Sequence, residues 1–219
     1  GASTDSDIEE TTRKHGLEFP LIVRAPGFQG GKHMELLEAP GPLRSDLYRG
    51  NGLHVIEFVN VAFRDDRAPD TLLYPKYRAF YVNGTLFPMH LFVADQYEVH
   101  KKTSDPVHAR YPWLLDLEVD FLADPRQHLP EGRWDELKTT MASFGVDYVG
   151  VDFAVCTDPD DQGKLVLFEC NPSMRNWLTL LPEGDRVQRK WQEVTLAAHF
   201  ALCEKAVIAP WAFELKKGK

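Results

Sequence analysis

The dipeptide Asn83-Gly84 stands between two runs of strand-forming residues, Tyr77–Val82 and Thr85–Phe92. Asn and Gly tolerate the positive φ angles of a two-residue turn, and this turn joins two antiparallel strands. The sequence therefore predicts a β-hairpin at this place. Tyr97–Lys102 follows with the same alternation of apolar and polar residues, and we expect it to form a third strand of the same sheet.

Further strands are expected on both sides of this hairpin. Phe19–Arg24 is a short apolar strand, and Met34–Ala39 pairs with it across a Gly-rich loop. Leu53–Val59 follows as a strong strand. Near the end of the chain, Tyr148–Cys156 and Lys164–Phe168 are expected to form a second hairpin across the turn sequence DPDDQG.

Helical spacing of apolar residues appears in two places. Between Trp113 and Gly145, apolar residues recur at three- and four-residue intervals, and Gly145 is suited to end a helix. A last amphipathic helix is predicted for about Asp185–Val207, with an inner face made of Trp191, Val194, Ala198 and Ala201. The polar segment Gly1–Thr12 is expected to be a frayed lead-in. Strands, then helices, then strands and a helix indicate an α+β fold built around antiparallel sheets.

Composition limits the classes of function. The chain has 219 residues and a net charge of -8, which opposes binding to nucleic acid. Its three cysteines have no zinc-type spacing and are too few for a disulfide framework, as expected for a cytoplasmic protein. No apolar run approaches the ~18 residues that a membrane span needs, and no signal-peptide pattern opens the sequence.

The Gly-rich loop Ala25–His33 is a candidate anion site. Gly27, Gly30 and Gly31 leave backbone N–H groups unobstructed, as a phosphate-binding nest requires. Positive charge flanks the loop, at Arg24 on the preceding strand and at Lys32. The alternative is an ordinary flexible hairpin, because the loop matches neither the P-loop pattern nor the dinucleotide fingerprint.

A second candidate is VIEFVN, Val55–Asn60, in which Glu57 lies within an apolar strand. A carboxylate in such a place needs a partner, and an adenine amine or a neighbouring Lys would serve. An edge strand also offers backbone groups that can bind a purine. An internal salt bridge to Glu57 is the alternative.

The basic strand YPKYRAFYVNG places Lys76 and Arg78 on one face. Two cations on one strand face repel each other unless an anion lies between them, and the planar fork of Arg suits phosphate or carboxylate. His90 and His100 are expected on the strands that follow. The alternative is a solvated sheet face.

The pair formed by Asp152 and the motif Glu169-x-Asn171 is the strongest candidate site. The predicted hairpin sets Asp152 beside Glu169, and like charges at adjacent positions are destabilising without a cation between them. An Asp, a Glu and an amide oxygen form a hard-oxygen set, which favours Mg²⁺ or Mn²⁺ over zinc. The alternative is a solvated strand end followed by a turn at Pro172.

Taken in order, these segments resemble the ATP-grasp superfamily, in the branch of glutamate ligases and glutathione synthetase. The matching segments are FPLIVRAPGFQGGKH, VIEFVN, KYRAFYVNG, and GVDYVGVDF with LFECNP, which together run from about Leu17 to Met174. The sequences of several of these segments are also similar to the ATP-grasp domains of tetratricopeptide-repeat proteins. The resemblance implies two antiparallel-sheet lobes with helices that bind a nucleotide between them. It places a lead-in at 1–16, a small nucleotide-loop lobe at 17–60 and a larger lobe at 61–219.

The resemblance also implies a role for each candidate residue. Arg24 and the loop Gly27–Lys32 would contact the phosphates of ATP, and Glu57 with the backbone of Phe58–Asn60 would hold adenine. Arg78, with the help of Lys76, would steady the γ-phosphate and the acyl phosphate. Two Mg²⁺ ions would lie on Asp152, Glu169 and Asn171.

The implied function is an ATP- and Mg²⁺-dependent carboxylate ligase that acts on a carboxylate-bearing small molecule or peptide through an acyl phosphate. Two departures from the family keep alternatives open. We expect the chain to be a module of a longer protein, without the domain that usually precedes the loop strand in this family, and Arg24 stands where the family usually has Lys. His90, His100 or Lys101 are candidates to compensate. The alternatives are an ATP-binding sensor or scaffold without turnover and a small-molecule kinase of the same architecture.

Overall fold

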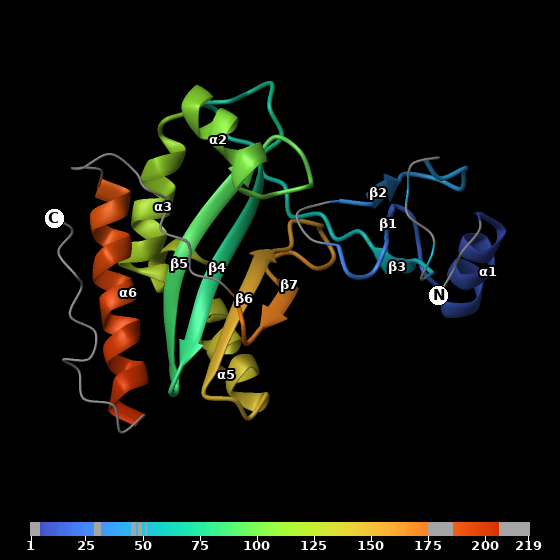
Figure 1. Cartoon of the computed structure of the whole chain (residues 1–219). Helices are drawn as coiled ribbons and strands as arrows, with labels where there is room; N and C mark the ends of the chain where they lie inside the picture. Colours follow the sequence, from blue (N-terminus) through green and yellow to red (C-terminus); the bar gives the residue numbers. More distant parts are fainter. Residues whose placement is uncertain are drawn as a thin grey trace, which may run out of the picture. The chain divides into compact units, whose positions relative to one another are not determined.

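The computed structural model describes residues 5–28, 32–44, 47, 50, 52–174 and 186–205 of the chain. The chain divides into two compact units, Gly1–Asn60 and Val61–Lys219 (Figure 1). Each unit is built around its own antiparallel sheet. The α+β class with two antiparallel sheets, expected from the sequence, is therefore confirmed.

The small unit holds a three-stranded sheet in the order β2-β1-β3. Its strands are β1 (Leu21–Arg24), β2 (Met34–Leu37) and β3 (His54–Glu57). Antiparallel pairing of β1 with β2 agrees with the predicted hairpin. Alternate residues of β1 are buried, so that Leu21 and Val23 anchor the sheet to a small apolar core.

The N-terminal segment differs from the expectation of a frayed lead-in. Asp5–His15 forms the helix α1, and its Ile8 is buried in the same apolar cluster as Val23 and Leu53. Thr12, one turn later, is also buried and donates a hydrogen bond to the carbonyl of Ile8. Ile8 is the one apolar residue of this helix, so the sequence shows no helical periodicity there. Packing of Ile8 against the small core therefore stabilises the helix more than its sequence pattern does.

The larger unit holds a four-stranded sheet in the order β5-β4-β6-β7, in which every neighbouring pair is antiparallel. The strands are β4 (Tyr74–Val82), β5 (Thr85–Ala94), β6 (Tyr148–Val155) and β7 (Leu165–Asn171). Asn83 and Gly84 have φ angles of 47° and 83°, as the predicted hairpin turn requires. Both predicted hairpins are therefore present.

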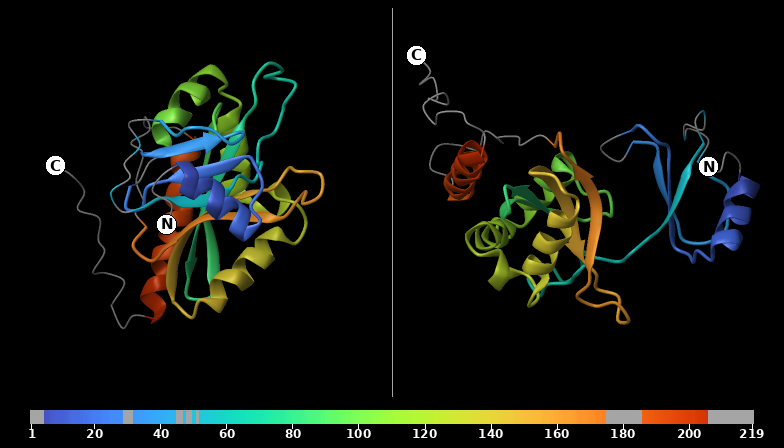
Figure 2. Two further views of the ribbon diagram at one scale, coloured as in Figure 1. Left: turned by 90° about the vertical axis from the view of Figure 1, so that its right-hand side faces the viewer. Right: turned by 90° about the horizontal axis from the view of Figure 1, so that it is seen from below.

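Helices follow β5 and β7. They are α2 (Lys101–Arg110), α3 (Leu114–Ala123), α4 (Pro125–His128), α5 (Arg133–Ser143) and α6 (Arg186–Lys205). Figure 2 shows the same helices around the sheet in two further orientations. Among the described helices, none combines the length and apolar character that crossing a membrane requires.

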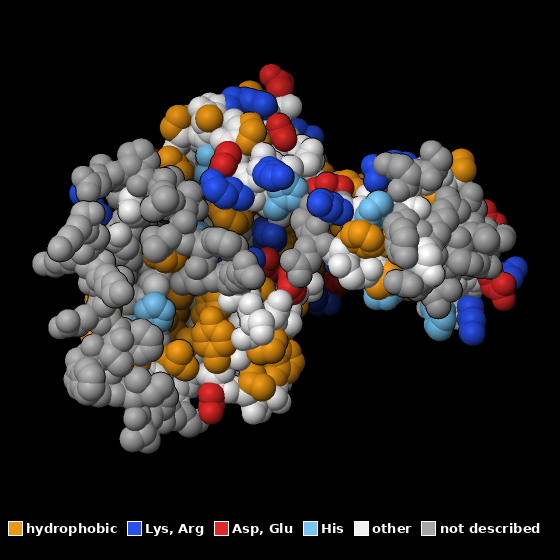
Figure 3. Space-filling view, viewed as in Figure 1, with side chains coloured by type: hydrophobic (Ala, Val, Ile, Leu, Met, Phe, Trp, Pro, Cys, Tyr) orange, Lys and Arg blue, Asp and Glu red, His pale blue; other side chains and the backbone are white. Residues whose placement is uncertain are grey.

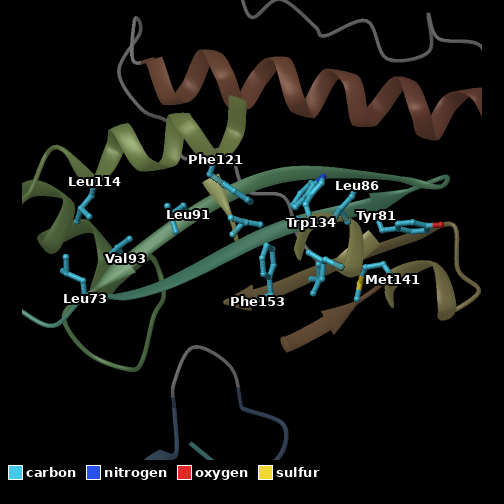
Figure 4. Packing of buried hydrophobic residues seen from close by; sticks show 14 of the residues in the cluster. Leu73, Tyr81, Leu86, Leu91, Val93, Leu114, Phe121, Trp134, Met141 and Phe153 are labelled. Carbon is cyan, nitrogen blue, oxygen red and sulfur yellow. The ribbon is translucent and has the colours of Figure 1, made fainter. Parts of the chain in front are cut away.

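The two faces of the large sheet pack differently. On one face, side chains of β4, β5 and β6 such as Tyr81, Leu91 and Phe153 pack against Phe121 and Trp134 of the helices that follow β5 (Figure 4). On the other face, Phe80, Val82 and Met89 pack against Ala198 of α6. Because strand residues alternate between faces, Lys76 and Arg78 lie on the face of Phe80. This second face is apolar near the Asn83-Gly84 turn and polar further along the strands.

The expected third strand at Tyr97–Lys102 is wrong. The segment ends in the first turn of α2, whose N-terminus is closed by a capping box between His100 and Thr103. The backbone N–H of His100 donates to Thr103 Oγ1 at 3.0 Å, and the N–H of Thr103 donates to His100 Nδ1 at 3.3 Å. These hydrogen bonds satisfy backbone groups at the helix start, which favours the helix over a strand.

Candidate functional site

A row of four polar residues crosses the large sheet from edge to edge. Arg78 of β4 is the direct partner of His90 on one side and of Asp152 on the other, and Asp152 is in turn the partner of Glu169. Direct cross-strand partners project to the same face. Reading from β5 to β7, the row is His90, Arg78, Asp152 and Glu169. Figure 3 shows basic and acidic side chains lying together on the face of the larger unit that it presents.

The centre of this row is a buried ion pair. Arg78 Nε donates to Asp152 Oδ1 at 2.6 Å, and a terminal Arg78 nitrogen donates to Asp152 Oδ2 at 2.9 Å. Lys76 Nζ lies 3.3 Å from Asp152 Oδ2. Asp152 is 3% exposed, whereas the Arg78 and Lys76 side chains are 17% and 18% exposed. The aspartate is thus enclosed, and its two cations are partly exposed.

The pKa shifts follow from this geometry. Burial alone would raise the pKa of Asp152, but the hydrogen bonds from Arg78 and the positive charges of Lys76 and Arg78 outweigh it, so that the pKa is lowered. Burial opposes the charge of Arg78, yet its hydrogen bond to Asp152 and the charges of Asp152 and Glu169 raise its pKa. Both groups are therefore charged at neutral pH.

The pairing of Asp152 also bears on the predicted metal site. Asp152 and Glu169 are direct cross-strand partners, and the sequence predicts a metal ion there because two adjacent carboxylates need a cation. The neighbouring strand β4 already supplies two cations, Lys76 and Arg78, to Asp152. Charge balance at Asp152 therefore does not itself require a metal ion. In the part of the chain that the structure describes, no group of three or more His, Cys, Asp or Glu side chains is placed to hold one.

The end of β7 orients the remaining two oxygen donors. Glu169 is exposed, and one of its oxygens accepts a hydrogen bond of 3.1 Å from Asn171 Nδ2. Asn171 Oδ1 in turn accepts the backbone N–H of Ser173 at 2.7 Å. The turn at Pro172 thus fixes the direction of the Asn171 amide, which would otherwise be free to rotate. Glu169 and Asn171 lie on one side of the strand, as their spacing predicts.

His90 and His100, which we expected to contact the nucleotide, have other surroundings. His90 is buried, its Nδ1 lies 3.5 Å from Glu118 Oε1, and its ring stacks on Phe92. His100 caps α2, and Lys101 after it forms an ion pair with Asp105 at 2.7 Å. Because His100 caps α2 and Lys101 begins it, the prediction that both lie on a strand beside the basic residues is wrong.

In the small unit, Arg24 steadies the Gly-rich loop. A terminal Arg24 nitrogen donates to the carbonyl of Phe28 at 3.0 Å, and the backbone N–H of Ala25 donates to the carbonyl of His33 at 2.9 Å. Gly27 has a φ of 83°, which is a backbone conformation that favours glycine. Lys32 is exposed. Gly30 and Gly31 lie outside the described residues.

The predicted adenine segment ends the third strand of the small unit. Glu57 is the last residue of β3 and is exposed. The expectation that this carboxylate is buried in the strand and needs a partner is therefore wrong. The backbone N–H of Phe58 donates to the carbonyl of Pro20 at 3.0 Å and is thus already engaged. Asn60 is half-buried. Any contact of this segment with a purine would therefore use Glu57 and the remaining backbone groups.

Sequence reasoning missed a group of polar residues beside His90. Glu118 of α3, Ser104 of α2 and Trp191 of α6 are all buried around this histidine. A signal was present for Glu118, because it shares one helix face with the buried Leu114 and Leu122 at four-residue spacing. A carboxylate on such a face requires a partner in the fold.

No protein-family model matches this sequence, and no curated protein matches it. Solved structures that are similar to the chain include the following three. Carboxyaminoimidazole ribonucleotide synthase from Aspergillus clavatus, complexed with ATP, has 11% sequence identity and a TM-score of 0.44 over 88% of this chain. Biotin carboxylase from Campylobacter jejuni, in a β,γ-ATP complex, has 9% identity and a TM-score of 0.37 over 87%.

The third structure is the macrocyclase MdnC from Microcystis aeruginosa, bound with the precursor peptide MdnA, at 14% identity and a TM-score of 0.40 over 89% of this chain. The chain spans about half the length of the three proteins, with shares of 45%, 45% and 52% in the same order.

Proposed function

We propose that this chain is an ATP- and Mg²⁺-dependent carboxylate ligase domain that works through an acyl phosphate. The observation that supports it most is the polar row of the large sheet. Two cations, Lys76 and Arg78, and two carboxylates, Asp152 and Glu169, lie on one sheet face with Asn171 at its end. Such a face combines groups for phosphate oxygens with hard-oxygen donors for a divalent cation.

Lys76 and Arg78 are the residues that would bind the transferred phosphoryl group. Both side chains are partly exposed, and the guanidinium carries five N–H donors, of which Asp152 uses two. Asp152 holds the guanidinium plane against β6, so that the direction of its N–H groups is fixed. Positioned donors of this kind stabilise charge that develops during transfer without reorganising.

The donor types fit Mg²⁺. Glu169 and Asn171 offer oxygens at the end of β7, and Asp152 lies directly across from Glu169. These three residues would hold the ion, which when bound would neutralise the phosphate charge and align the phosphates. In the small unit, Arg24, Gly27, Gly30, Gly31 and Lys32 are proposed to contact the phosphates, and Glu57, Phe58 and Asn60 the adenine.

The proposed reaction has two steps. A substrate carboxylate oxygen attacks the γ-phosphorus of ATP, the bond to the β–γ bridging oxygen breaks, and ADP leaves. An amine then attacks the acyl carbon, a C–N bond forms, the acyl C–O bond breaks, and phosphate leaves with loss of a proton from the amine. Arg78 and Lys76 would stay on the phosphoryl oxygens in both steps, so positioning is their main contribution.

Titration calorimetry with ATP, with and without Mg²⁺, tests the proposal. We expect binding that requires Mg²⁺ and that Glu169→Gln weakens, because an amide is a poorer ligand for a hard cation than a carboxylate. Glu131→Gln is the matched control, since Glu131 is exposed outside the site. Binding that is absent or indifferent to Mg²⁺ would overturn the proposal.

Product analysis separates the ligase from its rivals. Incubation with ATP and pools of carboxylates and amines should yield ADP, phosphate and a condensed product. ADP with a stable phosphorylated product would instead indicate a kinase. Tight Mg-ATP binding without ADP release from any pool would indicate a sensor or scaffold.

A further inference from the structure

A small cavity lies within the larger unit, at the β5 end of the polar row. Its volume is about 60 Å³, and it is lined by residues of β5, α2, α3 and α6. This is room for roughly four water molecules, or for a ligand of about that many heavy atoms. The lining residues that matter here are His90, Phe92, Ser104, His108, Glu118 and Trp191.

Three polar atoms around this cavity are buried without a hydrogen-bond partner within the described part of the chain: Ser104 Oγ, His108 Nε2 and Trp191 Nε1. Ser104 is 1% exposed and Trp191 is 6% exposed. A buried polar group that lacks a partner costs about 1–3 kcal/mol. Three of them around one cavity indicate that a polar molecule completes the site.

The electrostatics of the cavity favour a cation. Glu118 is 5% exposed, and its carboxylate lies 3.4 Å from the backbone N–H of Leu91 and 3.5 Å from His90 Nδ1, both long for hydrogen bonds. Burial lowers the pKa of His108, which keeps this ring neutral at neutral pH and able to accept a hydrogen bond. The rings of Phe92 and Trp191 complete a wall that suits an organic ammonium group.

The donor Trp191 Nε1 adds a second requirement. An indole N–H donates only, so its partner has to be an oxygen acceptor on the ligand. The ammonium would be held by the carboxylate of Glu118 with Ser104 Oγ and His108 Nε2. A primary amine with a hydroxyl or carbonyl oxygen two carbons away provides both groups within four heavy atoms.

We propose that this cavity binds the primary amine of a small amino alcohol or amino acid. In the ligase reaction, whose assignment this role rests on, the bound molecule would be the amine nucleophile. His90 joins the two places, because it lines the cavity and is the direct cross-strand partner of Arg78. The amine would thus enter from the edge of the sheet face that handles the phosphoryl group.

The test needs no nucleotide, so it does not depend on the ligase assignment. Ethanolamine, ethylamine and ethylene glycol are titrated into ¹⁵N-labelled full chain, and the indole N–H resonances of its five tryptophans are followed. Trp191→Phe identifies the Trp191 signal, because it removes the N–H and keeps an aromatic ring. We expect ethanolamine to shift this signal with saturation, ethylamine to bind more weakly, and ethylene glycol to cause no shift.

Variants of the acidic and hydroxyl groups complete the test. Glu118→Gln should weaken ethanolamine binding by about ten-fold or more, as expected for loss of a charge-assisted hydrogen bond. Glu131→Gln, on the exposed surface, should bind as the parent does. If Glu118→Gln does not fold, Ser104→Ala tests the proposal instead, and we expect it to bind ethanolamine more weakly than the parent does. No saturable shift with ethanolamine, an equal response to ethylene glycol, or unchanged binding in the variants would overturn the proposal.

If ethanolamine binds but Mg-ATP does not, the cavity assignment stands and the ligase role of the amine falls. If Mg-ATP binds and turns over but no amine probe reaches Trp191, the cavity assignment falls and the ligase proposal stands.

Discussion

Arg78 and Asp152 are direct partners on adjacent strands, and the guanidinium donates to both carboxylate oxygens at 2.6 and 2.9 Å. The two residues are 74 positions apart in the sequence. This pair fixes a rigid arginine fork at the centre of the polar face. It also occupies the carboxylate that the sequence had suggested as a metal ligand, so that a bound cation and Arg78 would share Asp152.

Removing the charge of Asp152 should destabilise the larger unit. In Asp152→Asn, Arg78 stays largely buried and loses its ionic partner, and breaking a buried pair typically costs 3–5 kcal/mol. Because the Arg78 side chain keeps some access to solvent, we expect a loss of about 2 kcal/mol in the free energy of unfolding. Urea denaturation measures it. Asp160→Asn, in the exposed turn between β6 and β7, should change stability by less than about 0.5 kcal/mol.

The contribution of Asp152 to the free energy of unfolding should be lost in acid. Its pKa in the folded chain is below the ordinary value of 3.8, so the unfolded chain binds the proton more readily. The contribution is complete above about pH 4 and is lost as the pH falls through the lower, folded-state pKa. Unfolding free energies measured between about pH 5 and pH 2 should therefore fall more steeply for the parent than for Asp152→Asn. Equal slopes for the two proteins would contradict the assigned pairing.

Local chemistry explains what the sequence could predict. The Asn83-Gly84 turn sets the register of β4 with β5. The short connection between β6 and β7 likewise sets Asp152 opposite Glu169. These relationships depend on residues close in sequence, where turn type and alternation decide the pairing.

The relationships that the sequence could not predict join distant segments. The pairing of β4 with β6 places Lys76 and Arg78 beside Asp152. This pairing follows from the order of strands in the sheet, which the alternation of apolar and polar residues does not predict. The cavity beside His90 depends on four elements meeting at one place. The alternation of apolar and polar residues at Tyr97–Lys102 predicts a strand, but a capping box at His100 favours the start of a helix there.

Gly150 should be essential for the geometry of the β7 end. A Cβ atom at this position would lie 2.6 Å from both Cβ and Sδ of Met174, which is buried against Phe80 and Met89. Met174 donates its backbone N–H to the carbonyl of Asn171 at 3.2 Å, so moving it displaces the turn that orients the Asn171 amide. We expect Gly150→Ala to destabilise the chain by about 1–3 kcal/mol, the usual range for overpacking.

The same substitution should weaken Mg-ATP binding more than its loss of stability explains, measured by calorimetry at a temperature where the variant is folded. Gly41→Ala is the control, because the nearest atom to an added Cβ there is a carbonyl oxygen at 3.9 Å. A Gly150→Ala protein that is destabilised and yet binds Mg-ATP as the parent does would show that the Asn171 amide is not a ligand.

The capping role of His100 can be separated from a role in binding. His100→Ala removes the acceptor for the N–H of Thr103 and should cost about 0.5–2 kcal/mol of unfolding free energy. His100→Ser restores an oxygen acceptor at the same position and should recover most of this loss. Since the ring of His100 is engaged with its own helix, both variants should bind Mg-ATP within about two-fold of the parent, a difference of about 0.4 kcal/mol. Thermal unfolding and calorimetry on the same samples measure the two quantities. If both variants lost affinity for Mg-ATP while their stability was unchanged, His100 would be inferred to contact the nucleotide.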